Sequence, residues 1–245
     1  MKVKLLHYTP LWVASKAIRK CWASEGKSDS GHNTCKECGE ETTWDRIDYG
    51  EYETCENCGY CRNISFEIVT GKKDKELIHR VGNKNKHAST LEHIVYSFDI
   101  DGISRACLQE LARHRHASLS VKSTRYTLKE LKDEEPFNND DKSVDRASKY
   151  VIIPRSLLVT RSILESLESL RLILNSGLSN DITKYCLPEA YKTSLVWTVN
   201  LRALQNFLEL RTSKAALWEI RELAYEIYKQ MPDEHKYLVE EFIHE

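Results

Sequence analysis

Residues 113–126 read RHRHASLSVKSTRY and contain three arginines, three serines and a threonine. Planar guanidinium groups beside short hydroxyls suit a ligand that has both a phosphate and a flat ring, because arginine supplies charge and paired hydrogen bonds. Serine hydroxyls and backbone N–H groups can complete a phosphate-binding shell. A simpler interpretation is that the triplet Arg113-His114-Arg115 only ends a helix, where cations complement the helix dipole.

The sequence just before this stretch predicts a strand and then a helix. Ile94, Tyr96 and Phe98 alternate with more polar positions between residues 93 and 100, which is the period-two pattern of a strand. Asp101-Gly102 predicts a turn. Apolar residues at helical spacing then predict a helix over residues 103–116, with the triplet on its last turn and the serine-rich string as a loop.

The rest of the chain reads mainly as helix. Helical patterns cover residues 10–24, 73–81, about 156–176 and 189–230, and residues 235–245 predict a short docking helix. Residues 131–148 are acidic and turn-prone, which predicts a solvated connection. One clear strand among several long helices is compatible with an α/β (α+β) fold in which long helices flank a small sheet.

Three ordered motifs together resemble one family. An Arg-His-Arg triplet, a gap of seven residues and Ser123 are similar to the signature of the flavin-dependent thymidylate synthases, the ThyX family. The string HASTLEH at residues 87–93 resembles the family's segment upstream of that signature. WTVNLR at 197–202 and NFLELR at 206–211 resemble its C-terminal ligand-binding helix. The resemblance covers residues 1–25 and 72–245 as one domain and leaves 26–71 as an inserted cysteine-rich module.

The resemblance implies a fold, an assembly and a reaction. The fold is ThyX-like, and the chain is expected to form a homotetramer whose sites are shared between subunits. The reaction is the reductive methylation of dUMP to dTMP. Methylenetetrahydrofolate is the carbon donor, and FAD reduced by NADPH is the hydride source. The difficult redox chemistry then belongs to the cofactor, while the protein supplies orientation and electrostatics.

Arg211 is the residue that we expect to be catalytic. It continues an apolar helical stripe formed by Leu201, Leu204 and Leu208. A simpler interpretation is an arginine that extends from the edge of the stripe to solvent. In the family that the chain resembles, the matching arginine contacts the pyrimidine and favours ionisation at N3. A fixed cation would stabilise that negative charge.

The resemblance also implies two sets of binding residues. The dUMP set is Glu110, Leu111, Arg113, Val121, Lys122, Ser123, Thr124, Arg125, Lys184 and Arg211. The FAD set is His87, Ser89, Arg113, His114, Arg115, Asn200, Arg202 and Asn206. The chain departs from the family pattern at four positions: a glutamine is Glu110, a glutamate is Val121, an arginine is Lys184 and a histidine is Ala215. Lys184 keeps the positive charge of arginine but lacks the planar guanidinium group, or fork, that binds a phosphate through two parallel hydrogen bonds.

Four cysteines in the inserted module predict a metal site. Cys35-x2-Cys38 and Cys55-x2-Cys58 are separated by sixteen residues, which is the spacing of four-cysteine zinc ribbons. A rubredoxin-like iron centre uses the same ligands, and Cys61 could substitute as a ligand. A module this small needs the folding energy of a metal, so we expect structural Zn²⁺.

Composition limits the remaining alternatives. The 245 residues have 41% hydrophobic content and a formal net charge of −1, which disfavours a general attraction to nucleic acid or membranes. We expect neither a signal peptide nor a membrane span, and the paired cysteines suggest a reducing, cytoplasmic location. Two alternatives stay open: a degenerate family member that only binds flavin or nucleotide, and a zinc-ribbon nucleic-acid-binding protein.

Overall fold

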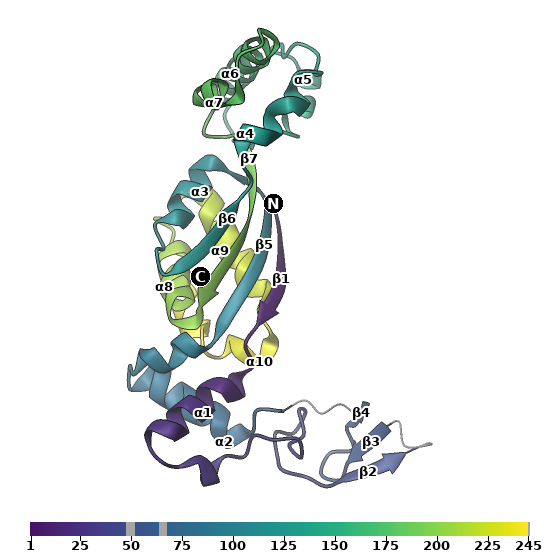
Figure 1. The fold of residues 1–245 in the computed structure, drawn as a ribbon, viewed down its shortest axis with the longest axis vertical. Helices are drawn as coiled ribbons and strands as arrows, with labels where there is room; N and C mark the ends of the chain where they lie inside the picture. Colours follow the sequence, from purple (N-terminus) through teal and green to yellow (C-terminus); the bar gives the residue numbers. More distant parts are fainter. Residues whose placement is uncertain (48–51, 64–67, 245) are drawn as a thin grey trace.

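The molecule is elongated, with a four-stranded sheet in the middle and smaller units at both ends (Figure 1). The structure is a computed structural model and describes residues 1–47, 52–63 and 68–244. Helices α4 to α7 lie at one end, and α1, α2 and a three-stranded sheet lie at the other (Figure 1). The predicted α/β (α+β) class, a small sheet with flanking helices, is confirmed.

The central sheet is antiparallel throughout. Its strands are β1 (Lys2–Tyr8), β5 (Val95–Ser104), β7 (Lys192–Asn200) and β6 (Ala117–Val121), in that spatial order. The strand predicted at 93–100 is therefore confirmed, but the turn predicted at Asp101-Gly102 is wrong. The strand passes through these residues with an irregular register between Asp101 and Ile103, and Gly102 adopts a φ of 77°, which glycine tolerates without strain.

The first part of the serine-rich string, residues 117–121, is a strand and not the predicted loop. It forms β6, which pairs along its whole length with β7. Helix α3 (Arg105–Ala112) ends one residue before Arg113, so the triplet lies just beyond the helix and not on its last turn. Ser104 begins this helix by accepting a hydrogen bond from the Cys107 N–H (3.0 Å), which is the usual role of an N-cap serine.

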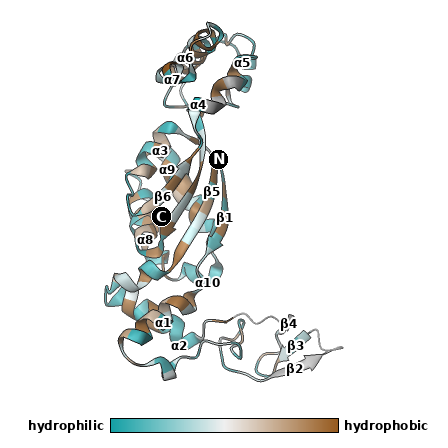
Figure 2. Cartoon of the chain, viewed as in Figure 1, coloured by the Kyte–Doolittle hydropathy of each residue, from teal (hydrophilic) through white to brown (hydrophobic). Residues whose placement is uncertain are grey.

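The helix predicted at 189–230 is three elements. Thr193, Leu195, Trp197 and Val199 are buried while their neighbours are not, and this alternation makes β7 a strand. Two helices follow, α8 (Leu201–Arg211) and α9 (Trp218–Gln230). Together with α3 they cover the apolar face of the sheet, where hydrophobic residues concentrate (Figure 2).

A second core lies beyond the Lys192 end of the sheet. It is built by α5 (Asp141–Ala147) and α6 (Leu157–Asn175), and it includes the buried Leu131 and Phe137. The helix predicted at 156–176 is confirmed, but the solvated connection predicted at 131–148 is wrong in part because apolar side chains within it are buried. The short helices of this unit are α4 (Thr124–Thr127), η5 (Leu128–Leu131), α7 (Asn180–Thr183) and η6 (Lys184–Cys186).

The opposite end combines helices with the cysteine-rich segment. It contains α1 (Leu11–Cys21), η1 (Glu25–Lys27), α2 (Lys72–Ile78), a π-helical turn η3 (His79–Lys84) and η4 (Ala88–His93). The small sheet is β2 (Trp44–Ile47), β3 (Tyr52–Cys55) and β4 (Cys61–Asn63). The chain closes with α10 (Asp233–Lys236) and η7 (Glu240–Phe242), two short turns in place of one docking helix. Across the described part of the chain, every helix is too short or too polar to cross a bilayer.

Candidate active site and metal centre

Arg211 lies at the centre of a hydrogen-bonded cluster. It is the last residue of α8, and its side chain is only 16% exposed. Its Nε–H donates to His114 Nε2 (2.9 Å), while its terminal nitrogens donate to Glu110 Oε2 (2.8 Å) and to the Glu110 carbonyl (3.3 Å). The ends of α3 and α8 therefore hold one guanidinium group from two sides.

His114 is an acceptor in this cluster and must be neutral there. Its Nε2 receives the Arg211 hydrogen bond, so its proton belongs on Nδ1. The ring is buried and packs edge-on against Phe207, with centroids 5.0 Å apart. Burial, followed by the charge of Arg211, lowers the pKa of His114 to about 4. The middle residue of the triplet thus orients Arg211.

The Glu110 carboxylate lies between two arginine side chains, Arg211 and Arg113. Besides Arg211, its carboxylate lies 3.9 Å from Arg113 NH1. The carboxylate that departs from the family's glutamine is therefore paired with two cations, Arg113 and Arg211, which compensate its negative charge. Leu111 is fully buried, so only its backbone can contact a ligand.

The dUMP set includes the consecutive residues Ser123, Thr124 and Arg125, here named the nucleotide loop, which contain a second arginine. Arg125 is 56% exposed and pairs with Asp181 through Nε (2.6 Å) and NH2 (3.1 Å), while its carbonyl accepts from Asn180 Nδ2 (2.6 Å). Ser123 precedes α4 as its N-cap, and Lys184 is exposed at the start of η6. This loop and α7 therefore form one polar unit. The predicted set omitted Asp181 and Asn180, which nothing in the spacing indicated.

The predicted flavin residues are mostly exposed donors. His87 and Ser89 flank the start of η4, and Asn206 lies on the solvent side of α8. Arg202 pairs with Glu92 (2.7 Å). Asn200 accepts from the Ala203 N–H (2.9 Å), so it caps α8 whatever else it binds. Exposed N–H donors of this kind fit the pyrophosphate and ring carbonyls of FAD.

The sheet separates the predicted flavin residues from the nucleotide loop within one chain. Ala117 pairs with Val199, near the flavin set, whereas Val121 pairs with Leu195, toward the nucleotide loop. The four steps between Ala117 and Val121 span about 13 Å. Arg113 and Arg115 are exposed just before β6, and Val121 is exposed at its end. The structure thus groups His114, Glu110 and Arg211 and leaves the nucleotide loop apart from them.

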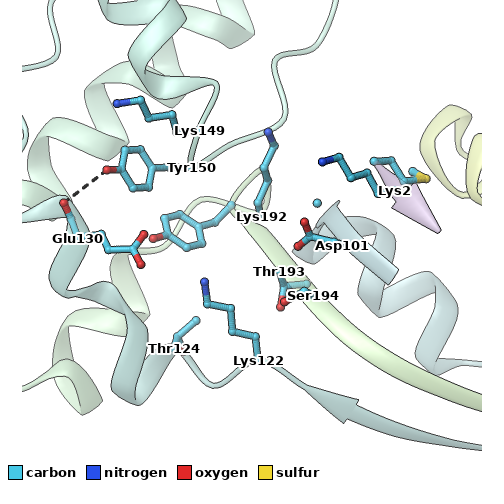
Figure 3. A pocket seen from close by; sticks show the side chains of 13 residues that line it. Lys2, Asp101, Lys122, Thr124, Glu130, Lys149, Tyr150, Lys192, Thr193 and Ser194 are labelled. Atoms are coloured by element: carbon cyan, nitrogen blue, oxygen red, sulfur yellow. Dashed lines mark hydrogen bonds between the residues drawn. The ribbon is translucent and has the colours of Figure 1, made fainter. Parts of the chain in front are cut away.

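A cavity of about 280 Å³ opens beside the nucleotide loop. Lys122 and Thr124 line it from the loop, and Lys2, Lys149 and Lys192 add positive charge (Figure 3). Lys122 and Lys192 line the cavity from opposite sides, and the Lys192 ammonium donates to the Ser148 carbonyl (Figure 3). The excess of lysine over carboxylate suits an anion.

The four cysteines converge as the spacing predicted. All four Sγ atoms lie within 4.8 Å of one another; Cys35 and Cys58 are 3.7 Å apart, and Cys38 and Cys55 are 3.9 Å apart. Four sulfurs bound tetrahedrally at the Zn–S distance would be about 3.8 Å apart. The side chain of Cys61, the other thiol considered, is outside the described part of the structure.

The two cysteine pairs have the same backbone geometry. The Gly39 N–H donates to the Cys35 carbonyl, and the Gly59 N–H donates to the Cys55 carbonyl, both at 2.8 Å. Both glycines have positive φ, at 71° and 72°, a conformation that glycine adopts readily. The donor set and its spacing therefore fit Zn²⁺.

The chain is similar to known proteins over its whole length. The family described as "Thymidylate synthase complementing protein" matches residues 4–235. The flavin-dependent thymidylate synthase of Wolinella succinogenes is 52% identical over 238 residues, which is 97% of each chain. The chain belongs to the flavin-dependent thymidylate synthase family.

Other members of the thymidylate synthase family support the same assignment. The enzyme of Campylobacter jejuni (strain RM1221) is 48% identical over 244 residues, covering 100% of this chain and 98% of its own. The crystal structure of Thymidylate Synthase X (ThyX) from Helicobacter pylori with FAD and dUMP superposes with a TM-score of 0.79 at 41% identity and covers both chains fully. The matched lengths include the cysteine-rich segment, which the family resemblance had left outside.

Proposed function

We propose that this protein methylates dUMP reductively to dTMP, with methylenetetrahydrofolate as carbon donor and FAD, reduced by NADPH, as hydride source. Membership of the flavin-dependent thymidylate synthase family supports the reaction. The single structural observation that supports it most is the fixed guanidinium group of Arg211. Bound FAD would supply the redox chemistry, while the residues of the chain bind and orient the nucleotide.

Arg211 is suited to stabilise charge on the pyrimidine. A guanidinium group has five N–H donors, and His114 and Glu110 occupy three of them. Two N–H donors remain for the carbonyl oxygens and N3 of uracil. Because the group is already oriented, it can stabilise the negative charge at N3 without rearrangement during the reaction.

Each set of binding residues has its own proposed ligand group. Ser123, Thr124, Arg125 and Lys184 would bind the phosphate of dUMP, with Lys122 adding charge from the cavity wall. His114 would act through Arg211, and Arg113 and Arg115 would contact FAD together with the exposed donors of η4 and α8. Val121 can contribute only its backbone polar groups or an apolar contact.

We propose a homotetramer in which one site draws on several subunits. The separation of the flavin set from the nucleotide loop across β6 supports this arrangement, because a second chain could bring its loop to the triplet of the first. We also propose that the four cysteines hold a structural Zn²⁺ and that residues 26–71 are a separate module of a cytoplasmic enzyme.

The test is an anaerobic assay of the purified protein with dUMP, methylenetetrahydrofolate, NADPH and FAD, following dTMP. We expect product that disappears when flavin is removed and returns when it is restored. Bound flavin without turnover would instead support the degenerate binder. Absence of both product and flavin binding would contradict the proposed function.

A further inference from the structure

The cysteine-rich module caps the first turn of α2. The Lys72 N–H donates to the Gly39 carbonyl (3.2 Å), and Gly39 directly follows the metal-ligand pair of Cys35 and Cys38. The next two N–H groups, of Lys73 and Asp74, donate to the two carboxylate oxygens of Asp29 (2.7 and 3.0 Å). Helix starts leave such donors unsatisfied, and here the module supplies all three acceptors.

The same contact is close-packed and buried. A Cβ at Gly71 would collide with Asp29, so the chain can approach this closely only at a glycine. Asp74 is fully buried and accepts hydrogen bonds from Ser28 (2.5 Å) and Ser30 (2.6 Å), in addition to an ion pair with Arg19. Burial alone would raise the pKa of Asp74, but these hydrogen bonds and the arginine lower it.

Helix α2 continues without a break into the segment that precedes the predicted flavin residues. The π-helical turn η3 follows at His79. The Val81 carbonyl accepts from the His87 N–H (3.0 Å), and Gly82 lies against Leu91 of η4. Asn83 Oδ1 accepts from Gln205 of α8 (3.3 Å), next to Asn206.

We propose that metal bound by the four cysteines fixes the start of α2 and, through the helical run Lys72–Lys84, positions the flavin-binding face formed by η4 and α8. The inference rests on the proposed zinc site and on the proposed flavin set. Metal binding restrains Cys38, and therefore Gly39, because a module of this size depends on its metal for a fixed conformation. Loss of the metal should then loosen α2 and weaken flavin binding, although none of the four metal-binding cysteines belongs to the proposed flavin set.

The experiment compares the full-length protein with two variants that break the same chain of contacts at different points. Cys38→Ser removes a metal ligand, and Asp29→Ala removes the cap but leaves all four ligands. For each protein we would measure zinc content, hydrogen exchange at residues 72–75 and the FAD dissociation constant. The matched controls are Cys186→Ser, an exposed thiol elsewhere, and Glu37→Ala, an exposed carboxylate between Cys35 and Cys38.

We expect about one zinc per chain in the parent protein and its loss in Cys38→Ser. Exchange at residues 72–75 should accelerate about fivefold to tenfold in both test variants, the factor expected from loss of a helix cap. FAD should bind several-fold more weakly in both test variants. Of these two, Asp29→Ala should keep its zinc and Cys38→Ser should lose it. The controls should match the parent.

Two outcomes overturn the inference by different routes. If Cys38→Ser loses zinc while its hydrogen exchange and FAD binding stay unchanged, the metal site is supported but its link to α2 is contradicted. A folded parent protein without metal would remove the zinc site itself. If Cys38→Ser fails to fold, Asp29→Ala decides alone, because unchanged exchange and FAD binding in that variant would also overturn the inference.

Discussion

Arg211 and Arg125 both pair with a carboxylate, but their surroundings are opposite. Arg211 is 16% exposed, and a buried histidine and the Glu110 backbone fix it in addition to the Glu110 carboxylate. Arg125 is 56% exposed, and its partner Asp181 is equally exposed. An exposed ion pair contributes little stability and is screened by solvent, whereas a group held from several sides keeps its geometry.

The difference indicates separate tasks for the two arginines. A pre-oriented cation is useful where charge develops during the reaction, because it does not have to reorganise. An exposed arginine can exchange its carboxylate partner for a phosphate at small cost and therefore suits ligand capture. We expect Arg211 to affect kcat and Arg125 to affect KM.

Replacing Arg211 should have the largest effect. Arg211→Ala should fold, bind FAD and lose about 1000-fold in kcat for dTMP formation, the scale measured when a pre-oriented charge-stabilising donor is removed. Arg211→Lys should recover little, because lysine lacks the fork that both His114 and Glu110 engage. Single-turnover kinetics with bound, reduced enzyme would measure the chemical step directly.

The matched control for that variant is Arg155→Ala, which removes an exposed arginine outside every proposed binding set. Its kcat should equal that of the parent protein. Near-normal turnover by Arg211→Ala would show that the buried cluster is structural and would remove the proposed catalytic role of Arg211.

Replacing Arg125 should have a smaller effect of a different kind. Arg125→Ala should raise the KM for dUMP about 10- to 30-fold with little change in kcat, because it removes charge-assisted hydrogen bonds to phosphate. Asp181→Asn should change KM in the opposite direction, by about twofold to threefold, because the competing carboxylate charge is lost. Steady-state kinetics at varied dUMP would measure both. A fall in kcat with unchanged KM in Arg125→Ala would reverse the assignment.

The sequence predicted the cysteine site better than the active-site geometry. Four cysteines with fixed spacing need only local turns to meet, and Gly39 and Gly59 supply those turns. The Arg211 cluster joins the ends of α3 and α8, which lie about a hundred residues apart in the chain. No periodicity in either segment indicates that Glu110 and His114 face Arg211.

Two of the errors in secondary structure, at residues 117–121 and 192–200, have a common physical cause. Residues 117–121 and 192–200 are strands because each pairs with a neighbour across the sheet. Their serine, threonine and lysine residues weakened the apolar alternation that identifies strands. Tertiary pairing therefore overrides a weak local signal. In β5 the alternation is clear in the sequence, because Tyr96, Phe98 and Ile100 are apolar residues that are all buried on one side.

Lowering the pH should destabilise the cluster of Arg211, His114 and Glu110, with a smaller effect than that of either arginine substitution. His114 accepts the Arg211 hydrogen bond only while neutral, and burial followed by the charge of Arg211 lowers its pKa to about 4. The unfolded chain has a histidine pKa near 6.5, so it binds the proton first as the pH falls. The stabilising contribution of neutral His114 is complete above about pH 6.5 and is lost as the pH falls toward 4.

Urea unfolding at pH 7 and pH 5 would measure this contribution. Burial lowers the pKa of His235 to about 3, so this histidine makes the free energy of unfolding of every variant fall in acid by the same amount. His114→Gln does not titrate and still offers an oxygen to Arg211, so its stability should fall by about 1–2 kcal/mol less than that of the parent between these pH values. His116→Gln replaces an exposed neighbouring histidine and should behave as the parent does. Equal acid sensitivity in all three proteins would mean that His114 is accessible to protons when folded, and Arg211 would then be no better fixed than Arg125.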